Sequence, residues 1–274
     1  MTRYARPETL TDALQLLEGG TWRILAGGTD LYPGAGAELA GDVLDIGRVP
    51  GLRGISLSDG LRIGAATTWS DIAAAPLPPA LFALQQAAVQ VGARQVQNTG
   101  TIGGNLCNAS PAADGVPPLL TLDAEVELAS PRGIRRLALA DFIEGPRRTA
   151  CAPDEILTAV HVPKAALQGR ASFLKLGARA HLVISIVMVA CRVVEQDGRV
   201  AEISLAAGSC SPVARRLSRV EAALLGQPMA GLAEKIRAED VAAHLAPIED
   251  IRASAGYRLE AATELLRRVL GGLA

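Results

Sequence analysis

Two glycine pairs decide how this 274-residue sequence is interpreted: Ala26-Gly-Gly-Thr-Asp-Leu31 and Thr101-Ile-Gly-Gly-Asn105. Both follow apolar stretches, and both have hydroxyl side chains beside the glycines. Successive glycines leave backbone N–H groups uncovered, and converging N–H groups can bind the oxygens of a pyrophosphate without many positive charges. A single Gly-Gly pair is most often only a tight turn, whereas two such loops favour a nucleotide site.

The second glycine pair lies in an unusual stretch, residues 98–114, which is rich in Gly, Asn, Ser and Thr. Apolar Ile102 and Leu106 interrupt it, and a solvent-exposed linker would not need them. We therefore expect an ordered, buried polar loop, and ordered loops of this kind are often functional.

Around these motifs, the first half of the chain alternates short helices and strands. Thr9 or Thr11 can cap a helix over residues 11–18, which Gly19-Gly20 ends. A helix after Pro78-Pro79 presents the apolar stripe Leu81, Leu84, Ala88 and Val91. The expected strands are residues 22–26, which we expect to be buried, 43–46, a hairpin of 52–56 with 61–65, and 156–162.

Residues 163–169 form a candidate boundary, and the pattern changes after it. Strands are expected at 172–177, 182–194 and 200–207, with Asp197-Gly198 as a hairpin turn. A helix is expected to begin at Pro212, and a last helix to run over residues 254–270 with Tyr257, Ala261, Leu265 and Val269 on one face. The prediction is an α+β chain with domains at 1–165 and 166–274, the second a three-stranded antiparallel sheet with helices.

Composition excludes several classes of protein. A hydrophobic fraction of 49% with only 3% aromatics predicts a core of Ala, Val, Leu and Ile. A net charge of −1 gives no basic surplus for nucleic acid. The longest apolar run, residues 182–191, is far shorter than the roughly 20 residues that span a bilayer. The N-terminus lacks a signal peptide pattern, so we expect a cytoplasmic protein.

Neither a metal site nor a competing catalytic motif is evident. The four cysteines have no Cys-x-x-Cys spacing, so no metal site is expected. Gly34-Ala-Gly36 begins a Rossmann fingerprint, but Leu39 fills its third glycine position. No P-loop is present, and Ser110 is not in a Gly-x-Ser-x-Gly elbow.

Over nearly its whole length the chain resembles the FAD-binding, or medium, subunit of molybdenum hydroxylases, the family of xanthine dehydrogenase and carbon monoxide dehydrogenase. The resemblance is carried by two pyrophosphate loops, two connecting-strand motifs and two C-terminal motifs. These are residues 24–31, Thr101-Ile-Gly-Gly-Asn-Leu-Cys-Asn-Ala-Ser-Pro-Ala-Ala-Asp114, residues 43–52, residues 61–68, Phe173-Leu-Lys-Leu-Gly-Ala-Arg179 and Ser254-Ala-Gly-Tyr-Arg258.

The resemblance implies a two-lobed PCMH-type (VAO-like) FAD-binding domain followed by the C-terminal α+β domain. It implies that the two loops bind the FAD pyrophosphate, that Asp114 accepts hydrogen bonds from sugar or ribityl hydroxyls, and that Lys175 lies near the flavin. No catalytic residue is expected in this chain. The implied cofactor-binding residues are Ile24, Leu25, Ala26, Gly27, Gly28, Thr29, Asp30, Leu31, Val91, Thr101, Ile102, Gly103, Gly104, Asn105, Asp114, Leu157 and Lys175.

The resemblance also implies partners: a large subunit with the molybdenum cofactor and a small subunit with 2Fe-2S clusters, in a heterotrimer or a dimer of heterotrimers. Many relatives carry an acidic residue beside the flavin where this chain has Arg179-Ala-His-Leu-Val-Ile-Ser185, which argues against NAD as acceptor. Two alternatives stay open. One is a self-contained reductase of the UDP-N-acetylenolpyruvoylglucosamine reductase type, and the other is a scaffold subunit without flavin.

Overall fold

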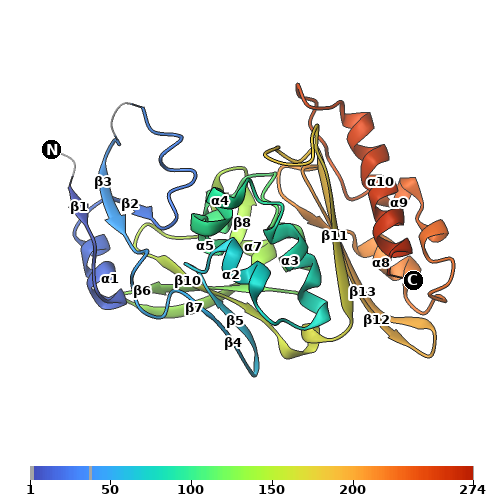
Figure 1. Ribbon diagram of the computed structural model, residues 1–274, viewed down its shortest axis with the longest axis horizontal. Coiled ribbons are helices and arrows are strands. Elements are labelled where there is room, and N and C mark those ends of the chain that lie inside the picture. Colours follow the sequence, from blue (N-terminus) through green and yellow to red (C-terminus); the bar gives the residue numbers. More distant parts are fainter. Residues whose placement is uncertain (1–2, 37–38, 274) are drawn as a thin grey trace.

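The computed structural model describes residues 3–36 and 39–273, which form three consecutive α+β units (Figure 1). We call them the first lobe (residues 4–45), the second lobe (residues 55–162) and the C-terminal unit (residues 170–271). Met1, Thr2 and Ala274, which belong to the predicted domains, lie outside the described residues.

The first lobe is a small parallel sheet covered by one helix. Its elements are β1 (Tyr4–Ala5), α1 (Leu10–Glu18), β2 (Trp22–Leu25) and β3 (Asp42–Asp45), with the strands in the order β1-β3-β2. Thr9 caps α1 by accepting the Asp12 N–H at 3.1 Å, which confirms that helix. The expectation that residues 22–26 are buried is wrong, since Leu25 alone is buried in β2, an edge strand.

The second lobe is a five-stranded antiparallel sheet in the order β4-β5-β10-β6-β7. The predicted hairpin is present, although its first strand begins only at Ile55, because Leu52 N–H donates to Val49 O in a turn before it. Strand 156–162 is confirmed. The strands are β4 (Ile55–Ser58), β5 (Gly60–Gly64), β6 (Glu125–Ser130), β7 (Gly133–Ala138) and β10 (Ile156–Val162), with the short pair β8 (Ile143–Gly145) and β9 (Arg148–Thr149) beside them.

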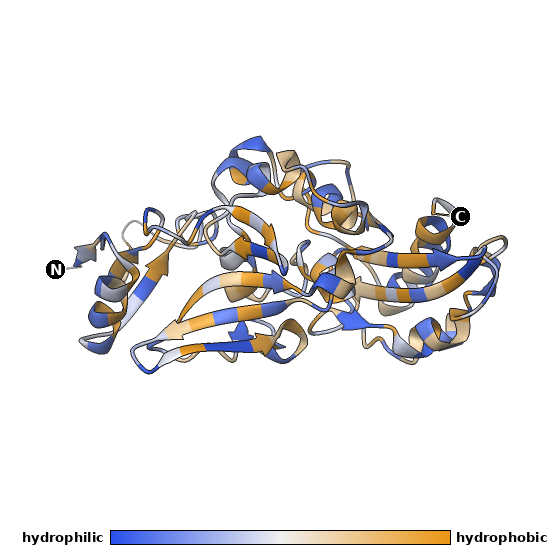
Figure 2. Ribbon diagram, turned by 90° about the horizontal axis from the view of Figure 1, so that it is seen from below, coloured by the Kyte–Doolittle hydropathy of each residue, from blue (hydrophilic) through white to orange (hydrophobic). Residues whose placement is uncertain are grey.

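Short helices cover the apolar face of this sheet, and their shared core contains Trp69, Leu84 and Leu106. They are α2 (Trp69–Ala74), η1 (Pro79–Leu81), α3 (Phe82–Ala88), α4 (Arg94–Thr99), α5 (Ile102–Asn108), α6 (Val116–Thr121) and α7 (Leu139–Phe142). The expected polar loop over residues 98–114 is therefore largely helical, because Thr101 accepts the Gly104 N–H and caps α5. Figure 2 shows hydrophobic and hydrophilic bands alternating along the sheet strands.

The C-terminal unit, which follows η2 (Lys164–Leu167), is an antiparallel sheet of four strands rather than three. Its strands are β11 (Arg170–Leu176), β12 (Val187–Gln196), β13 (Arg199–Gly208) and β14 (Arg215–Arg216), in sequence order. Its helices are α8 (Ser218–Leu224), η3 (Ala233–Lys235), α9 (Ala238–Ala242) and α10 (Ala255–Gly271).

Two expectations fail in this unit. The helix predicted from Pro212 begins only at Ser218, because Arg215 and Arg216 pair with β13 instead. Residues 182–186 precede the strand that was expected to include them. On α10, Tyr257 is exposed, whereas Leu265 and Val269 are buried.

Both faces of the C-terminal sheet are covered, which joins this unit to the second lobe. Along β12, Val187, Val189 and Cys191 enter the core formed with α8 and α10. Met188 and Ala190 point the other way and pack with α3. The predicted α+β architecture, with a two-lobed N-terminal part and a C-terminal unit, is therefore confirmed.

Candidate functional site

A cavity of ≈ 680 Å³ opens where the first lobe meets the second. Its walls come mainly from three segments far apart in sequence, at residues 22–31, 100–108 and 151–157. This volume lies within the ~300–1,000 Å³ typical of cofactor and ligand pockets.

Most of the predicted cofactor-binding residues meet in this cavity. It is lined by Ile24, Leu25, Ala26, Gly27, Gly28, Thr29, Asp30, Leu31, Val91, Thr101, Gly103, Gly104, Asn105 and Leu157. Three predicted residues do not line it: Ile102 is fully buried in the core, and Asp114 and Lys175 lie elsewhere. The structure thus brings both glycine motifs to one place, as the sequence indicated.

The first glycine motif lines this cavity, and its backbone donors are unpaired within the described part of the chain. Among the described residues, no hydrogen-bond acceptor faces the backbone N–H of any residue from 27 to 31. A Cβ on Gly27 would lie 2.0 Å from Thr99 O, so this glycine lets the loop pack against the backbone before the second motif. Gly28 has φ +70°, a left-handed conformation that favours glycine. The loop therefore forms a backbone cradle for an anion.

The second motif behaves differently, since its backbone donors are already used. Ile102 N–H donates to Thr67 O at 3.0 Å, Gly103 N–H to Ala65 O at 2.8 Å, and Asn105 N–H to Thr101 O at 3.0 Å. With Gly104 N–H bound to the Thr101 hydroxyl oxygen, residues 102–105 offer no free N–H. This motif contributes shape and side chains rather than backbone amides.

Side chains of α5 complete this end of the cavity. The Asn105 Oδ1 atom is buried and has no hydrogen-bond partner among the described residues. Asn108 Nδ2 donates to Asp30 Oδ1 at 2.9 Å and so ties α5 to the first glycine loop. Arg147 donates to Asn108 Oδ1 and fixes that amide from the other side. An orphaned acceptor on a residue of the cavity lining suits a ligand that donates a hydrogen bond.

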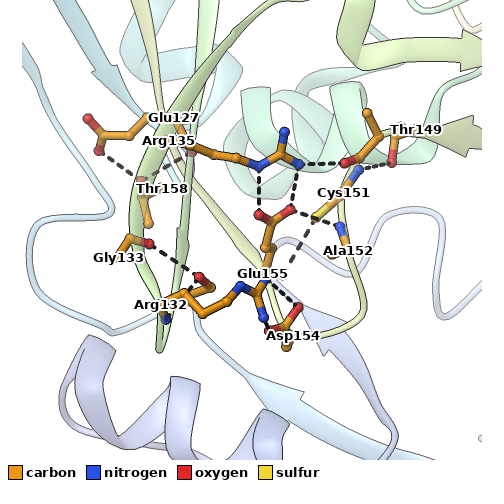
Figure 3. A network of polar contacts seen from close by, with 12 residues as sticks. Glu127, Arg132, Gly133, Arg135, Thr149, Cys151, Ala152, Asp154, Glu155 and Thr158 are labelled. Atoms are coloured by element: carbon orange, nitrogen blue, oxygen red, sulfur yellow. Dashed lines mark hydrogen bonds and ion pairs between the residues drawn. The ribbon is translucent and has the colours of Figure 1, made fainter.

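The opposite wall, residues 151–157, is stabilised by an ion pair (Figure 3). Arg135 donates to both Glu155 oxygens, at 2.7 and 2.8 Å, and the Ala152 N–H donates to the same carboxylate at 2.9 Å. The Arg135 bond, with the Ala152 N–H, holds the pKa of Glu155 below its ordinary value, although burial acts in the opposite direction. Arg135 also donates to Ala150 O, which fixes the approach to this wall.

Sequence reasoning missed several lining residues. Trp69 lies in the wall although it belongs to neither predicted loop, and its contribution follows only from the fold. Cys107 and Cys151 also line the cavity, although they are widely separated in sequence and had no spacing that linked them. Cys107 lies within the quoted second motif, which was the one available signal.

Asp114 and Lys175 form a buried pair directly behind the cavity wall. Lys175 Nζ lies 2.7 Å from Asp114 Oδ2, and Ser185 Oγ donates to Asp114 Oδ1 at 2.7 Å. Burial raises the pKa of Asp114, while Lys175 and Ser185 act in the opposite direction. The Lys175 side chain is thus buried, although it belongs to a strand with partly exposed neighbours. Both Asp114 oxygens already have protein donors.

The residues present fit an elongated dinucleotide cofactor. The free N–H groups of residues 27–31 match pyrophosphate oxygens. A Cβ at Gly27 would clash with Thr99 O and one at Gly28 with the Tyr32 ring, so either would displace the loop. Apolar Ile24, Val91 and Leu157 provide surfaces for flat rings.

Comparison with known proteins decides the family. A family model described as the FAD binding domain in molybdopterin dehydrogenase matches residues 1–165. The chain belongs to this family. A second model, the CO dehydrogenase flavoprotein C-terminal domain, matches residues 172–273 of this molybdopterin dehydrogenase flavoprotein.

Relatives of this flavoprotein cover almost its full length. It is 33% identical over 275 residues to the putative xanthine dehydrogenase FAD-binding subunit of Escherichia coli (strain K12), covering 97% of this chain and 94% of that one. It is 36% identical over 237 residues to the nicotinate dehydrogenase FAD-subunit of Eubacterium barkeri, covering 82% and 80%. The structure of carbon monoxide dehydrogenase from Hydrogenophaga pseudoflava matches with a TM-score of 0.91 at 29% identity, over 99% of this chain and 96% of that one.

Proposed function

We propose that this chain is the FAD-binding electron-transfer subunit of a multi-subunit molybdenum hydroxylase, which passes electrons from iron–sulfur clusters to FAD and on to an external acceptor. The observation that carries the proposal is the cradle of free N–H groups at residues 27–31, in a cavity formed by the family's FAD-binding domain. The division into a cofactor domain at 1–165 and a C-terminal domain at 166–274 is part of the same proposal.

In this proposal the first loop binds the pyrophosphate through its backbone, and the Thr29 and Thr101 hydroxyls stand beside it. Asn105 Oδ1 accepts a hydrogen bond from the cofactor, which would satisfy its buried oxygen. Bound FAD supplies reversible redox chemistry that accepts and releases one or two electrons. The chain itself binds and orients the cofactor, and it needs no general acid or base for electron delivery.

The partners follow from the relatives, which are named as FAD-binding or medium subunits of larger dehydrogenases. We propose a large subunit with the molybdenum cofactor and a small subunit with 2Fe-2S clusters, in a cytoplasmic heterotrimer or a dimer of heterotrimers. Within the described part of the chain, no helix combines the length and the apolarity needed to cross a membrane. The substrate is converted on the large subunit, so the residues of this chain do not determine it.

The proposal is tested on the complex purified from its native host. Rapid mixing with its substrate should bleach the flavin absorbance, and a complex rebuilt without the iron–sulfur subunit should not show this bleaching. The chain expressed alone should bind FAD but oxidise no purine, aldehyde or N-heterocycle.

The same experiments separate the alternatives. Substrate-dependent flavin reduction by the isolated chain would contradict the proposal and favour a self-contained reductase. An isolated chain without a flavin spectrum, even after addition of FAD, would favour a scaffold subunit.

A further inference from the structure

The guanidinium of Arg258, near the start of α10, is buried and serves three acceptors. Nη1 donates to Ile186 O at 2.5 Å and to Ser209 O at 2.9 Å, and Nη2 donates to Asp250 Oδ1 at 2.7 Å. The residue is 2% exposed. Arg258 thus joins the start of β12 to the residue that follows β13. Arg258 lies in a motif that the cavity does not use.

Both backbone acceptors of Arg258 lead toward Asp114. Ile186 follows Ser185, whose hydroxyl donates to Asp114 Oδ1. Ser209 N–H donates to Pro111 O at 3.0 Å, three residues before Asp114. Ser209 has φ +62°, a left-handed conformation that a non-glycine residue adopts only when its surroundings hold it.

The chain neighbours of Asp114 and the second hydrogen bond of Lys175 lead on to the cavity wall. A Cβ on Gly115, the next residue, would lie 2.5 Å from the Trp69 ring and 3.1 Å from Asn105 Oδ1, both in the cavity lining. Lys175 Nζ also lies 3.3 Å from Gln90 O, and the next residue, Val91, lines the cavity.

We propose that Arg258 is a positioning residue for the flavin cavity. It fixes Ser185 and the turn before Asp114, so that the buried pair of Asp114 and Lys175 supports the wall at Val91 and at Trp69 with Asn105. The inference rests on the proposed function, because its effect is on FAD binding.

The geometry requires arginine at this position. One planar guanidinium reaches three acceptors in different directions, whereas a lysine ammonium carries the same charge without that rigid fork. Asp250 balances the buried charge, and its carboxylate also accepts the Arg252 N–H at 2.9 Å.

The test compares Arg258→Lys with Val269→Ala, a control that removes buried methyl groups from the same helix about three turns away from Arg258. FAD affinity is measured by fluorescence quenching at a temperature where circular dichroism shows every variant folded. Arg258→Lys should raise the FAD Kd about tenfold, the effect of losing one or two buried hydrogen bonds. Val269→Ala should leave the Kd within about twofold.

A double-mutant cycle shows whether Arg258 acts through Ser185. Ser185→Ala should also raise the FAD Kd. The Kd of the double variant should rise by a factor clearly smaller than the product of the two single factors, because both changes break one network. The visible circular dichroism of bound flavin should change alike in Arg258→Lys and Ser185→Ala and stay unchanged in Val269→Ala.

The outcomes are distinct. A wild-type chain that binds no FAD would contradict the proposed function. Wild-type binding, with Arg258→Lys equal to Val269→Ala or with fully multiplicative single effects, would overturn the positioning role alone.

Discussion

Lys175 Nζ lies 2.7 Å from Asp114 Oδ2, and this ion pair connects the C-terminal sheet to the N-terminal lobes. The two side chains are 6% and 9% exposed, so both charges are almost withdrawn from water. A buried pair of this kind contributes little net stability, but removing one partner leaves an uncompensated buried charge. Asp114 therefore has a structural role that its sequence position alone did not indicate.

Asp114→Ala should destabilise the protein by about 3–5 kcal/mol, because Lys175 would stay buried without its carboxylate. A purely cofactor-binding Asp114 would instead leave the fold largely intact and weaken FAD alone, as the resemblance suggested. Denaturant unfolding of the FAD-free chain measures the difference. An unchanged free energy of unfolding would show that the pair is not formed.

The matched control is the double variant Asp114→Asn/Lys175→Met, which removes both charges and keeps similar volumes. It should recover much of the lost stability, because no unpaired charge remains. A double variant as unstable as Asp114→Ala would argue that packing, and not charge, decides the result.

Gly27→Ala should weaken FAD binding at least about tenfold, because its Cβ would lie 2.0 Å from Thr99 O and push the first loop out of place. Gly36→Ala is the control, since a Cβ there would meet no atom of the other described residues, chain neighbours apart, within 4 Å. Isothermal titration with FAD compares the two. Equal affinities would place the pyrophosphate away from this loop.

Two adjacent glycines of the second motif should give opposite phenotypes. A Cβ on Gly103 would lie 2.7 Å from Ala65 Cβ, so Gly103→Ala should lower the melting temperature by several degrees through a clash inside the fold. A Cβ on Gly104 would approach only the Thr101 hydroxyl, at 2.9 Å, and Gly104 is exposed in the cavity. Gly104→Ala should therefore weaken FAD with a smaller thermal effect. The reverse pattern would place the cofactor against Gly103.

Local sequence patterns were enough to predict that the glycine motifs form one site, that residues 156–162 form a strand and that the fold is α+β. Thr9 marks the start of α1, and Asp197-Gly198 marks the turn between β12 and β13; each signal lies next to the element it predicts. Pairings between distant segments have no such signal. Arg215 and Arg216 form a strand because they pair with β13 and because Arg216 donates to Glu221. The helix-like spacing of apolar residues in this segment predicted a helix instead.

The part of the candidate site that the backbone of the glycine loop forms could be predicted from the sequence. The part that side chains from distant elements form could not. Gly27 and Gly28 could be chosen from residue type alone, because glycine exposes N–H groups. Glu155 and Trp69 reach the same cavity from other elements, and nothing local marks them. Residues 102–108 are helical because Thr101 caps them, whereas the glycine pair in this segment had indicated a loop.

We expect FAD to be bound non-covalently, although Cys107 and Cys151 line the cavity. Burial raises the pKa of Cys151 to about 11, so at neutral pH its thiol is protonated and a poor nucleophile. Acid precipitation should release all flavin into the supernatant as FAD, and Cys151→Ser should behave identically. Flavin that stays in the wild-type pellet but leaves the Cys151→Ser pellet would reveal a thioether at this residue.

The ion pair of Glu155 and Arg135 should make the stability of the cavity wall depend on pH. The pKa of Glu155 is lowered from an ordinary value of 4.5, first by the Arg135 hydrogen bond. Above that value the carboxylate is ionised in both folded and unfolded chains, so the pair contributes fully. As pH falls below about 4.5, Glu155 binds a proton in the unfolded chain before it does so in the folded chain. The stability contributed by the ion pair therefore decreases until the pH reaches the lower pKa of the folded state.

Glu155→Gln should therefore be less stable than the wild type at pH 6 to 7, and the difference should shrink steadily below about pH 4.5. Differential scanning calorimetry across this range measures it as a gap between two melting temperatures. Glu144→Gln is the control, because Glu144 and Arg148 form an exposed pair, 45% and 71% accessible, whose loss should change stability little at any pH. A Glu155→Gln gap that stays constant down to pH 3.5 would mean that Glu155 has the same pKa in the folded and unfolded chains, so that the ion pair with Arg135 does not stabilise the ionised carboxylate.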